Sequence, residues 1–139
     1  MSGTYRIIEH PSDAGIEAEG ETLAEAFALA AEGLMAVIVD PASVEAGESR
    51  TVAVDGPDDE RLLVRWLGEI LWLYDGEGFV SRRFEVEITP GGRISAAAFG
   101  EPLDAAKHAL RVDVKAVTYH GLEVRRTPGG WSVRAYIDI

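Results

Sequence analysis

The chain of 139 residues contains 24 acidic and 13 basic residues, which gives a formal net charge of −11, and it has no cysteine. Its length and ordinary hydrophobic content predict one folded domain over residues 1–139, and the absence of cysteine excludes disulfides and thiolate metal sites. The acidic charge disfavours direct nucleic-acid binding, which depends on Lys and Arg, and suits solubility, cations or a basic protein partner.

Alternating apolar and polar residues predict two short strands at the start of the chain, over residues 5–9 and 15–19. In the second strand Ile16 and Ala18 face inward. The His-Pro-Ser-Asp sequence of residues 10–13 predicts a turn between the two strands. Because turns lie at the surface, the side chains of this turn are available for chemistry.

Two amphipathic helices follow. The first begins at a capping box formed by Thr22 and Glu25, ends before Pro41 and packs one apolar stripe on a sheet. A strand over residues 49–55 precedes the second helix, which carries three carboxylates at residues 58–60. These acids interact favourably with the positive end of the helix dipole, so we assign them to the helix.

Trp72 falls on the polar side of the second helix, together with Arg61, Arg65 and Glu69. Two interpretations stay open. A loop or a second layer covers the indole, which is the favoured interpretation, or the indole is an exposed anchor for a partner. The second interpretation rests on the enrichment of Trp and Arg among the residues that dominate binding energy at interfaces.

The last third of the chain reads as β-structure. Residues 84–88 and 94–98 alternate about a Pro-Gly-Gly turn and predict a hairpin, and an irregular segment over residues 100–108 follows. Residues 112–119 predict a strand with Val112, Val114 and Ala116 on one side and Asp113, Lys115, Val117 and Tyr119 on the other.

A turn at residues 120–121 and a final strand complete the pattern. The final strand places Trp131, Val133, Ala135 and Ile137 on the core face and leaves Asp138 facing out. The predicted fold class is therefore α+β, with two helices packed on antiparallel or mixed β-sheet.

Four separated motifs carry a family resemblance. They are HPSDAGI at residues 10–16, GEPLDAAKH at 100–108, VKAVTYHG at 114–121 and the final IDI. With these motifs in this order, the chain resembles the archease family, whose members assist the RtcB-type tRNA-splicing RNA ligase. The resemblance covers nearly the whole chain. It implies an archease-like fold and a non-catalytic accessory protein that promotes guanylylation and multiple turnover of that ligase.

The resemblance also implies a metal site. It places a divalent cation, with calcium expected and magnesium or manganese as alternatives, on Asp13, Asp138 and Ile139. Hard cations of this kind take carboxylate and carbonyl oxygens, and Ile139, as the last residue, would offer main-chain carboxylate oxygens. Without the family, each aspartate would be read as an acid that bonds nearby N–H groups.

Lys115 matches the lysine that the family needs to stimulate the ligase, so the resemblance places it at the interface with the ligase or near its nucleotide. The plainer interpretation pairs Lys115 with Asp113 or Glu123 on the solvated face, an interaction worth little. Around the same site, His10 would orient Asp13, and Tyr119 and His120 would form the border and contact the partner.

The histidines do not indicate a zinc site. No pair of His10, His108 and His120 has the spacing that places two ligands on one helix face, so a three-histidine site is disfavoured. Glu101, Asp104 and His108 match further family positions, and either ordering of the loop or contact with a partner fits them.

No phosphate-binding loop, dinucleotide-binding glycine motif or nucleophile elbow is present, so we expect no independent catalysis. The alternative function is a general chaperone or modulator of RNA-processing enzymes such as tRNA methyltransferases. A small metal-dependent hydrolase using His10 and Asp13 ranks last. The N-terminal residues show no signal-peptide pattern and no long apolar run occurs, so we expect a cytoplasmic protein without membrane contact.

Overall fold

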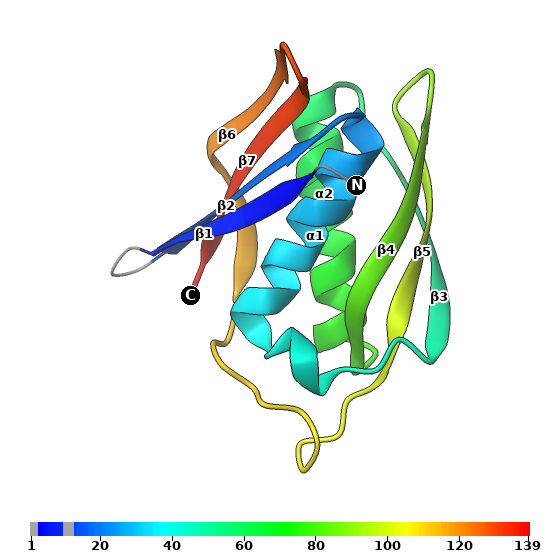
Figure 1. Cartoon of the computed structure of the whole chain (residues 1–139), viewed down its shortest axis with the longest axis vertical. Helices are drawn as coiled ribbons and strands as arrows, with labels where there is room; N and C mark the ends of the chain where they lie inside the picture. Colours follow the sequence, from blue (N-terminus) through cyan, green and yellow to red (C-terminus); the bar gives the residue numbers. More distant parts are fainter. Residues whose placement is uncertain (1–2, 10–12) are drawn as a thin grey trace.

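The computed structural model describes residues 3–9 and 13–139, in which two helices lie between two antiparallel sheets (Figure 1). One sheet has the order β1-β2-β7-β6 and the other the order β3-β5-β4, which confirms the α+β prediction. The elements are β1 (Thr4–Glu9), β2 (Asp13–Gly20), α1 (Leu23–Ile38), the short 3₁₀ helix η1 (Pro41–Ser43), β3 (Glu48–Asp55), α2 (Asp59–Asp75), β4 (Phe79–Thr89), β5 (Arg93–Pro102), β6 (Ala116–Thr127) and β7 (Gly130–Asp138).

The predicted caps begin both helices. The Thr22 hydroxyl accepts a hydrogen bond from the Glu25 N–H at 3.1 Å, and the Glu25 carboxylate accepts one from the Glu21 N–H at 3.1 Å, one residue before the cap. Asp58 caps α2 by accepting from the Arg61 N–H at 2.8 Å. In each case a side-chain oxygen satisfies a backbone donor that the first turn of a helix leaves without a partner.

The prediction that α1 buries a single apolar stripe is wrong. The helix packs on β1, β2 and β7 on one side and on β4 on the other, so apolar residues all around it are buried. The small side chains of α1 permit this burial between two sheets. At Gly33, for example, an added Cβ would lie 2.8 Å from Ile16 of β2, closer than two carbon atoms can approach.

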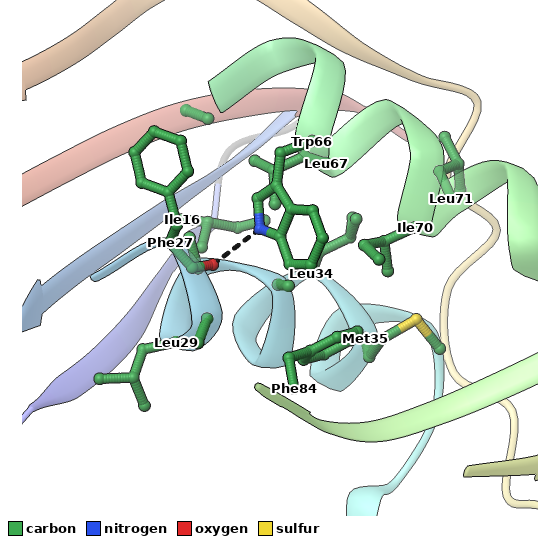
Figure 2. Packing of buried hydrophobic residues seen from close by; sticks show 14 of the residues in the cluster. Ile16, Phe27, Leu29, Leu34, Met35, Trp66, Leu67, Ile70, Leu71 and Phe84 are labelled. Carbon is green, nitrogen blue, oxygen red and sulfur yellow. Dashed lines mark hydrogen bonds between the residues drawn. The ribbon is translucent and has the colours of Figure 1, made fainter. Parts of the chain in front are cut away.

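The core joins the two helices and the three-stranded sheet around Trp66 (Figure 2). Its indole N–H donates to the main-chain oxygen of Phe27 in α1 at 2.9 Å, and its ring meets Phe84 of β4 edge-on at 5.7 Å. The buried polar atom is therefore satisfied, and a single side chain connects α1, α2 and β4.

The segment before β6 departs from the predicted strand. Regular structure begins only at Ala116, and Val112, expected on the side of Val114, is 40% exposed. The chain is instead held by the end of α1, since the Arg111 and Val112 N–H groups donate to the main-chain oxygens of Ile38 and Val37 at 2.7 and 3.2 Å. The last carbonyl groups of a helix have no partner within the helix. Here those of α1 accept hydrogen bonds from N–H groups that would otherwise pair with a neighbouring strand.

The turn predicted at residues 120–121 is also wrong. β6 continues through these residues, and the extra length is absorbed in a bulge, because Thr118 pairs with Tyr136 while Glu123 pairs with Arg134. Four residues of β6 therefore lie opposite one residue of β7. Gly121 has a φ of +65°, which a glycine adopts without strain and which makes the bulge compact.

Trp72 is 51% exposed, so the favoured prediction that a loop or a second layer covers it is wrong. The indole lies on the solvent side of α2 and packs against Gly76 in the turn that ends the helix. Neither α1 nor α2 has the length and hydropathy that a membrane crossing requires, within the part of the chain that the structure describes.

Candidate functional site

The site begins with two aspartates that the fold places directly opposite each other. β2 and β7 pair antiparallel in a register that sets Asp13 against Asp138, although the two residues are far apart in the sequence. Residues opposite each other in such a pair share one face, with Cβ atoms about 4.5–5.5 Å apart. Ala14 and Ile137 point into the core, so both carboxylates lie on the outer face of the four-stranded sheet.

The end of β7 also meets the chain that enters β6. The Lys115 N–H donates to the main-chain oxygen of Asp138 at 2.8 Å, and Ala116 pairs with the same residue. Lys115 is exposed, and among the described residues no acidic side chain lies within ion-pair distance of its amine. Glu123, one predicted partner of Lys115, is paired instead with Arg125 at 2.9 Å and Arg134 at 3.3 Å.

The bulge of β6 forms the next part of the same face. The Thr118 hydroxyl donates to the main-chain oxygen of Tyr136 at 3.2 Å and accepts from the His120 N–H at 3.3 Å. The Arg134 guanidinium donates to the main-chain oxygen of Gly121 at 3.0 Å. These bonds fix a bulge on which Tyr119 is 60% exposed and His120 is exposed.

Tyr136 also lies on this face, and sequence analysis assigns it no role. Its ring lies against Gly15 of β2 and Gly121 of the bulge, where an added Cβ would come within 3.0 and 2.7 Å of it. It also approaches the His120 ring, with 6.1 Å between centroids. The alternation of β7 could have indicated this position, because residues two apart in a strand, such as Tyr136 and Asp138, lie on the same face.

Known proteins are similar to this chain over nearly all of its length. The model of the Archease protein family (MTH1598/TM1083) matches residues 5–139. The chain belongs to the archease family. It is 43% identical to Protein archease of Pyrococcus abyssi, over 94% of this chain and 95% of that protein, and 37% identical to Protein archease of Methanosarcina mazei, over 97% and 95%.

Two solved structures share the archease fold. The solution structure of protein 1598 of Methanobacterium thermoautotrophicum superposes with a TM-score of 0.84 at 32% identity and covers 97% of this chain and 98% of that one. The crystal structure of a Thermotoga maritima archease, described as a possible chaperone, has a TM-score of 0.59 and covers 96% and 94%. At 15% identity, the second likeness shows the fold alone.

The donor atoms at the aspartate pair fit a hard divalent cation. Asp13 and Asp138 present carboxylate oxygens on one face, and the main chain of Ile139 follows directly, which is the oxygen set that calcium and magnesium prefer. Within residues 3–9 and 13–139, however, no three His, Asp or Glu side chains gather closely enough to enclose an ion. His10 lies outside the described residues. Cation binding by Asp13, Asp138 and Ile139 therefore stays a prediction, as do the partner contacts of Lys115, His10, Tyr119 and His120.

A second polar cluster of this archease-family chain, the loop cluster, lies at the end of β5 and in the loop that follows, and it has a different character. The Glu101 carboxylate accepts from the Glu45 N–H at 2.8 Å, from the Lys107 amine at 2.8 Å and from the His108 ring at 2.9 Å. His108 is buried, and its Nδ1 accepts from the Asp104 N–H at 3.0 Å.

These contacts decide the chemistry of the loop cluster. Because Nδ1 of His108 accepts a hydrogen bond, its proton sits on Nε2 and is donated to Glu101, so neither ring nitrogen can bind a metal. The Glu45 N–H, then His108 and Lys107, lower the pKa of Glu101 to about 2. Glu101, Asp104 and His108 thus order the loop, and contact of these residues with a partner stays a prediction.

Proposed function

We propose that this archease-family protein is a non-catalytic accessory protein that activates an RtcB-type tRNA-splicing or RNA-repair ligase. In this proposal it promotes guanylylation of the ligase and allows multiple turnover, while the ligase performs all the chemistry. The observation that carries the proposal is the pairing of Asp13 with Asp138 on an outer sheet face, next to the exposed Lys115. The family membership supports it, since the resemblance implies this activity.

The aspartate pair supports the metal part of the proposal through its electrostatics. Like charges directly opposite each other destabilise a strand pair, so two facing carboxylates favour the approach of positive charge. Asp13, Asp138 and the main-chain oxygens of Ile139 would hold a divalent cation, with calcium as the first expectation and magnesium or manganese as alternatives. When bound, the cation would supply positive charge for phosphate oxygens in the ligase's nucleotide site.

Lys115 has a separate role in this proposal. Its main chain is bonded to Asp138 and its side chain is exposed, and in this proposal the ammonium group acts next to the aspartate pair. The ammonium group is a flexible point charge that can contact a triphosphate or an acidic side chain of the ligase. Positioning and charge stabilisation dominate catalysis at phosphorus, so an accessory protein that places such charges can accelerate guanylylation.

The bulge residues Tyr119 and His120 complete the proposed contact surface. Both are exposed, and the hydrogen bonds of Thr118 hold the bulge against Tyr136, two residues before Asp138. The net charge of −11 supports a protein partner with a basic surface and disfavours RNA, whose phosphates would be repelled.

The test is a guanylylation assay in which the ligase is in excess over the accessory protein. Asp138→Asn and Asp13→Asn should each reduce the stimulated rate at least about tenfold, as loss of a charge that acts at the reacting centre typically costs about 2 kcal/mol or more. Glu87→Gln, which removes one charge from the outer face of the other sheet, is the matched control and should stimulate normally. Normal stimulation by both aspartate variants would refute the metal part of the proposal.

A general chaperone or modulator of RNA-processing enzymes, such as a tRNA methyltransferase, is the second candidate. The description of the Thermotoga maritima archease as a possible chaperone favours it. In that case the whole acidic surface would act, and single changes at the aspartate pair should have little effect. Protection of an aggregating methyltransferase by wild-type and Asp138→Asn protein, measured by light scattering, separates the two functions.

A further inference from the structure

One edge strand of the three-stranded sheet has no bulge. β4 and β6, which also lie at sheet edges, both contain register shifts, between Ser81 and Arg83 and between Thr118 and Glu123. β3 pairs with β5 over its whole length without a shift. Bulges are one of the devices that keep edge strands from pairing with another chain, so β3 is a more accessible edge.

The pairing of β3 with β5 determines which main-chain N–H and C=O groups of β3 point away from the sheet. The Gly56 N–H donates to the main-chain oxygen of Gly92 at 3.0 Å, which continues the register of β3 with β5 and marks even-numbered residues as facing β5. Ser49, Thr51, Ala53 and Asp55 therefore direct their main-chain groups away from the sheet.

Two of these outward carbonyl groups are already engaged. The Arg65 guanidinium donates to the main-chain oxygen of Asp55 at 2.9 Å, and Arg50 donates to that of Ser49 at 3.0 Å. Both arginines bond the ends of the strand. Between these ends, Thr51 and Ala53 present N–H and C=O groups toward the space beside the strand, and we call residues 51–53 the open edge.

The open edge lies beside a groove of α2. A hollow of about 420 Å³ is lined by Val54, Asp55, Arg65, Gly68 and Glu69. Gly68 widens it, since an added Cβ there would have no atom within 4 Å. Trp72 follows one helical turn later on the same face and is 51% exposed. β1, an edge whose register also runs without a shift, contains none of the large exposed apolar side chains of the described residues.

The charge around the groove decides which occupant fits. β3 and the segment from Asp58 to Asp75 contain seven acidic residues and three arginines. Each arginine already lies within 4.0 Å of an acid: Arg50 of Glu48, Arg61 of Asp58 and Arg65 of Asp55. A second copy of this chain bound here would bring its acids close to these acids, and the two sets would repel each other. A basic segment could instead form ion pairs with the acids that these arginines do not pair.

We propose that the open edge, together with the neighbouring groove of α2 and Trp72 beside it, binds an extended, basic segment of a partner protein as an added β-strand. Main-chain hydrogen bonds to Thr51 and Ala53 would hold the segment, and its alternate side chains would pack on Trp72 and pair with the acids of β3 and α2. The surface lies on the sheet that does not contain the aspartate pair, so this inference does not depend on the proposed function.

The test uses the ¹⁵N-labelled full chain and a synthetic eight-residue peptide of alternating Lys and Val with blocked ends. Addition of the peptide should shift the amide signals of Thr51 and Ala53 and the indole signal of Trp72, and should slow hydrogen exchange at both amides. Thr51→Pro removes an outward donor without breaking the ladder to β5, because proline is tolerated where the N–H of an edge strand faces solvent. It should weaken binding at least about fivefold, as expected for a lost hydrogen bond and a blocked approach.

Three controls keep the result interpretable. Thr51→Val keeps the N–H and should bind as the wild type does, and a peptide methylated on alternate amide nitrogens keeps the charge but cannot pair. Ala53→Pro replaces Thr51→Pro if that variant loses its native spectrum. The inference is overturned if the methylated peptide binds equally, if neither proline variant weakens binding, or if an alternating Glu-Val peptide binds as well. It is also overturned if sedimentation shows a dimer of the wild type that Thr51→Pro dissociates.

Discussion

Two acidic regions of this molecule differ in how their carboxylates are neutralised. In the loop cluster, Glu101 receives hydrogen bonds from a main-chain N–H, a lysine and a buried histidine. At the outer sheet face, Asp13 and Asp138 instead face each other across a strand pair. The first arrangement orders a loop. The second favours added positive charge, as a binding site for a cation or a basic partner does.

The loop cluster should respond to substitution with the largest change in stability. His108→Ala would leave the Asp104 N–H without an acceptor, remove a donor to Glu101 and open a buried cavity, so we expect a loss of about 2–3 kcal/mol in the free energy of unfolding. Urea titration measures it. Lys107→Gln, which removes two partly exposed ion pairs, to Glu45 and Glu101, is the control and should cost less than about 1 kcal/mol. An equal loss in both variants would contradict the structural role of His108.

The bulge of β6 should show an intermediate effect. Gly121→Ala forces a side chain into a backbone with a φ of +65° and against the Tyr136 ring, so we expect a loss of about 1–2 kcal/mol. Gly129→Ala, where an added Cβ has open space, is the matched control in thermal unfolding. If the two alanine variants unfold at the same temperature, the Tyr136 contact does not fix the bulge.

The pH dependence of stability should identify Glu101 as an acid stabilised by the fold. Its pKa of about 2 lies below the unfolded value of about 4.3, so its contribution is present above about pH 4.3 and is lost as the pH falls toward 2. In Glu101→Gln, the unfolding free energy measured between pH 5 and pH 2 should therefore fall less steeply with acid than in the wild type. An unchanged slope would show that other carboxylates cause the acid sensitivity.

The aspartate pair should give the smallest change, in the opposite direction. Without divalent cations, Asp138→Asn removes the repulsion from Asp13 and should leave the protein equally stable or more stable by up to about 1 kcal/mol. Thermal unfolding in the presence of a chelator tests this. A clear loss of stability would mean that Asp138 has a structural partner and that the contrast between the two regions is wrong.

The sequence predicted the features that depend on local chemistry. The caps at Thr22 and Asp58 and the inward residues of β7 follow from rules that act within a few residues. The approach of Asp13 and Asp138 does not follow from spacing. It was expected from the family resemblance, and the register of β2 with β7 then placed the two residues opposite each other.

The features that the sequence missed depend on tertiary contacts. Burial of α1 on all sides needs a second sheet, which an apolar stripe cannot reveal. The bulge at residues 119–122 arises because β7 holds both ends of β6, whereas a Gly-containing dipeptide alone resembles a turn. The role of His108 depends on Glu101, which lies at the end of β5, and on Glu45, which lies in a distant segment and donates its N–H to Glu101.

The most direct test of the account is calorimetric titration of calcium into the metal-free protein at constant ionic strength. We expect binding at one site in the wild type and in Glu87→Gln. The affinity should be reduced at least about tenfold in Asp13→Asn and in Asp138→Asn, because each variant removes a charged oxygen ligand. Equal calcium affinity in the wild type and both aspartate variants, or no binding by the wild type of calcium, magnesium or manganese, would contradict it.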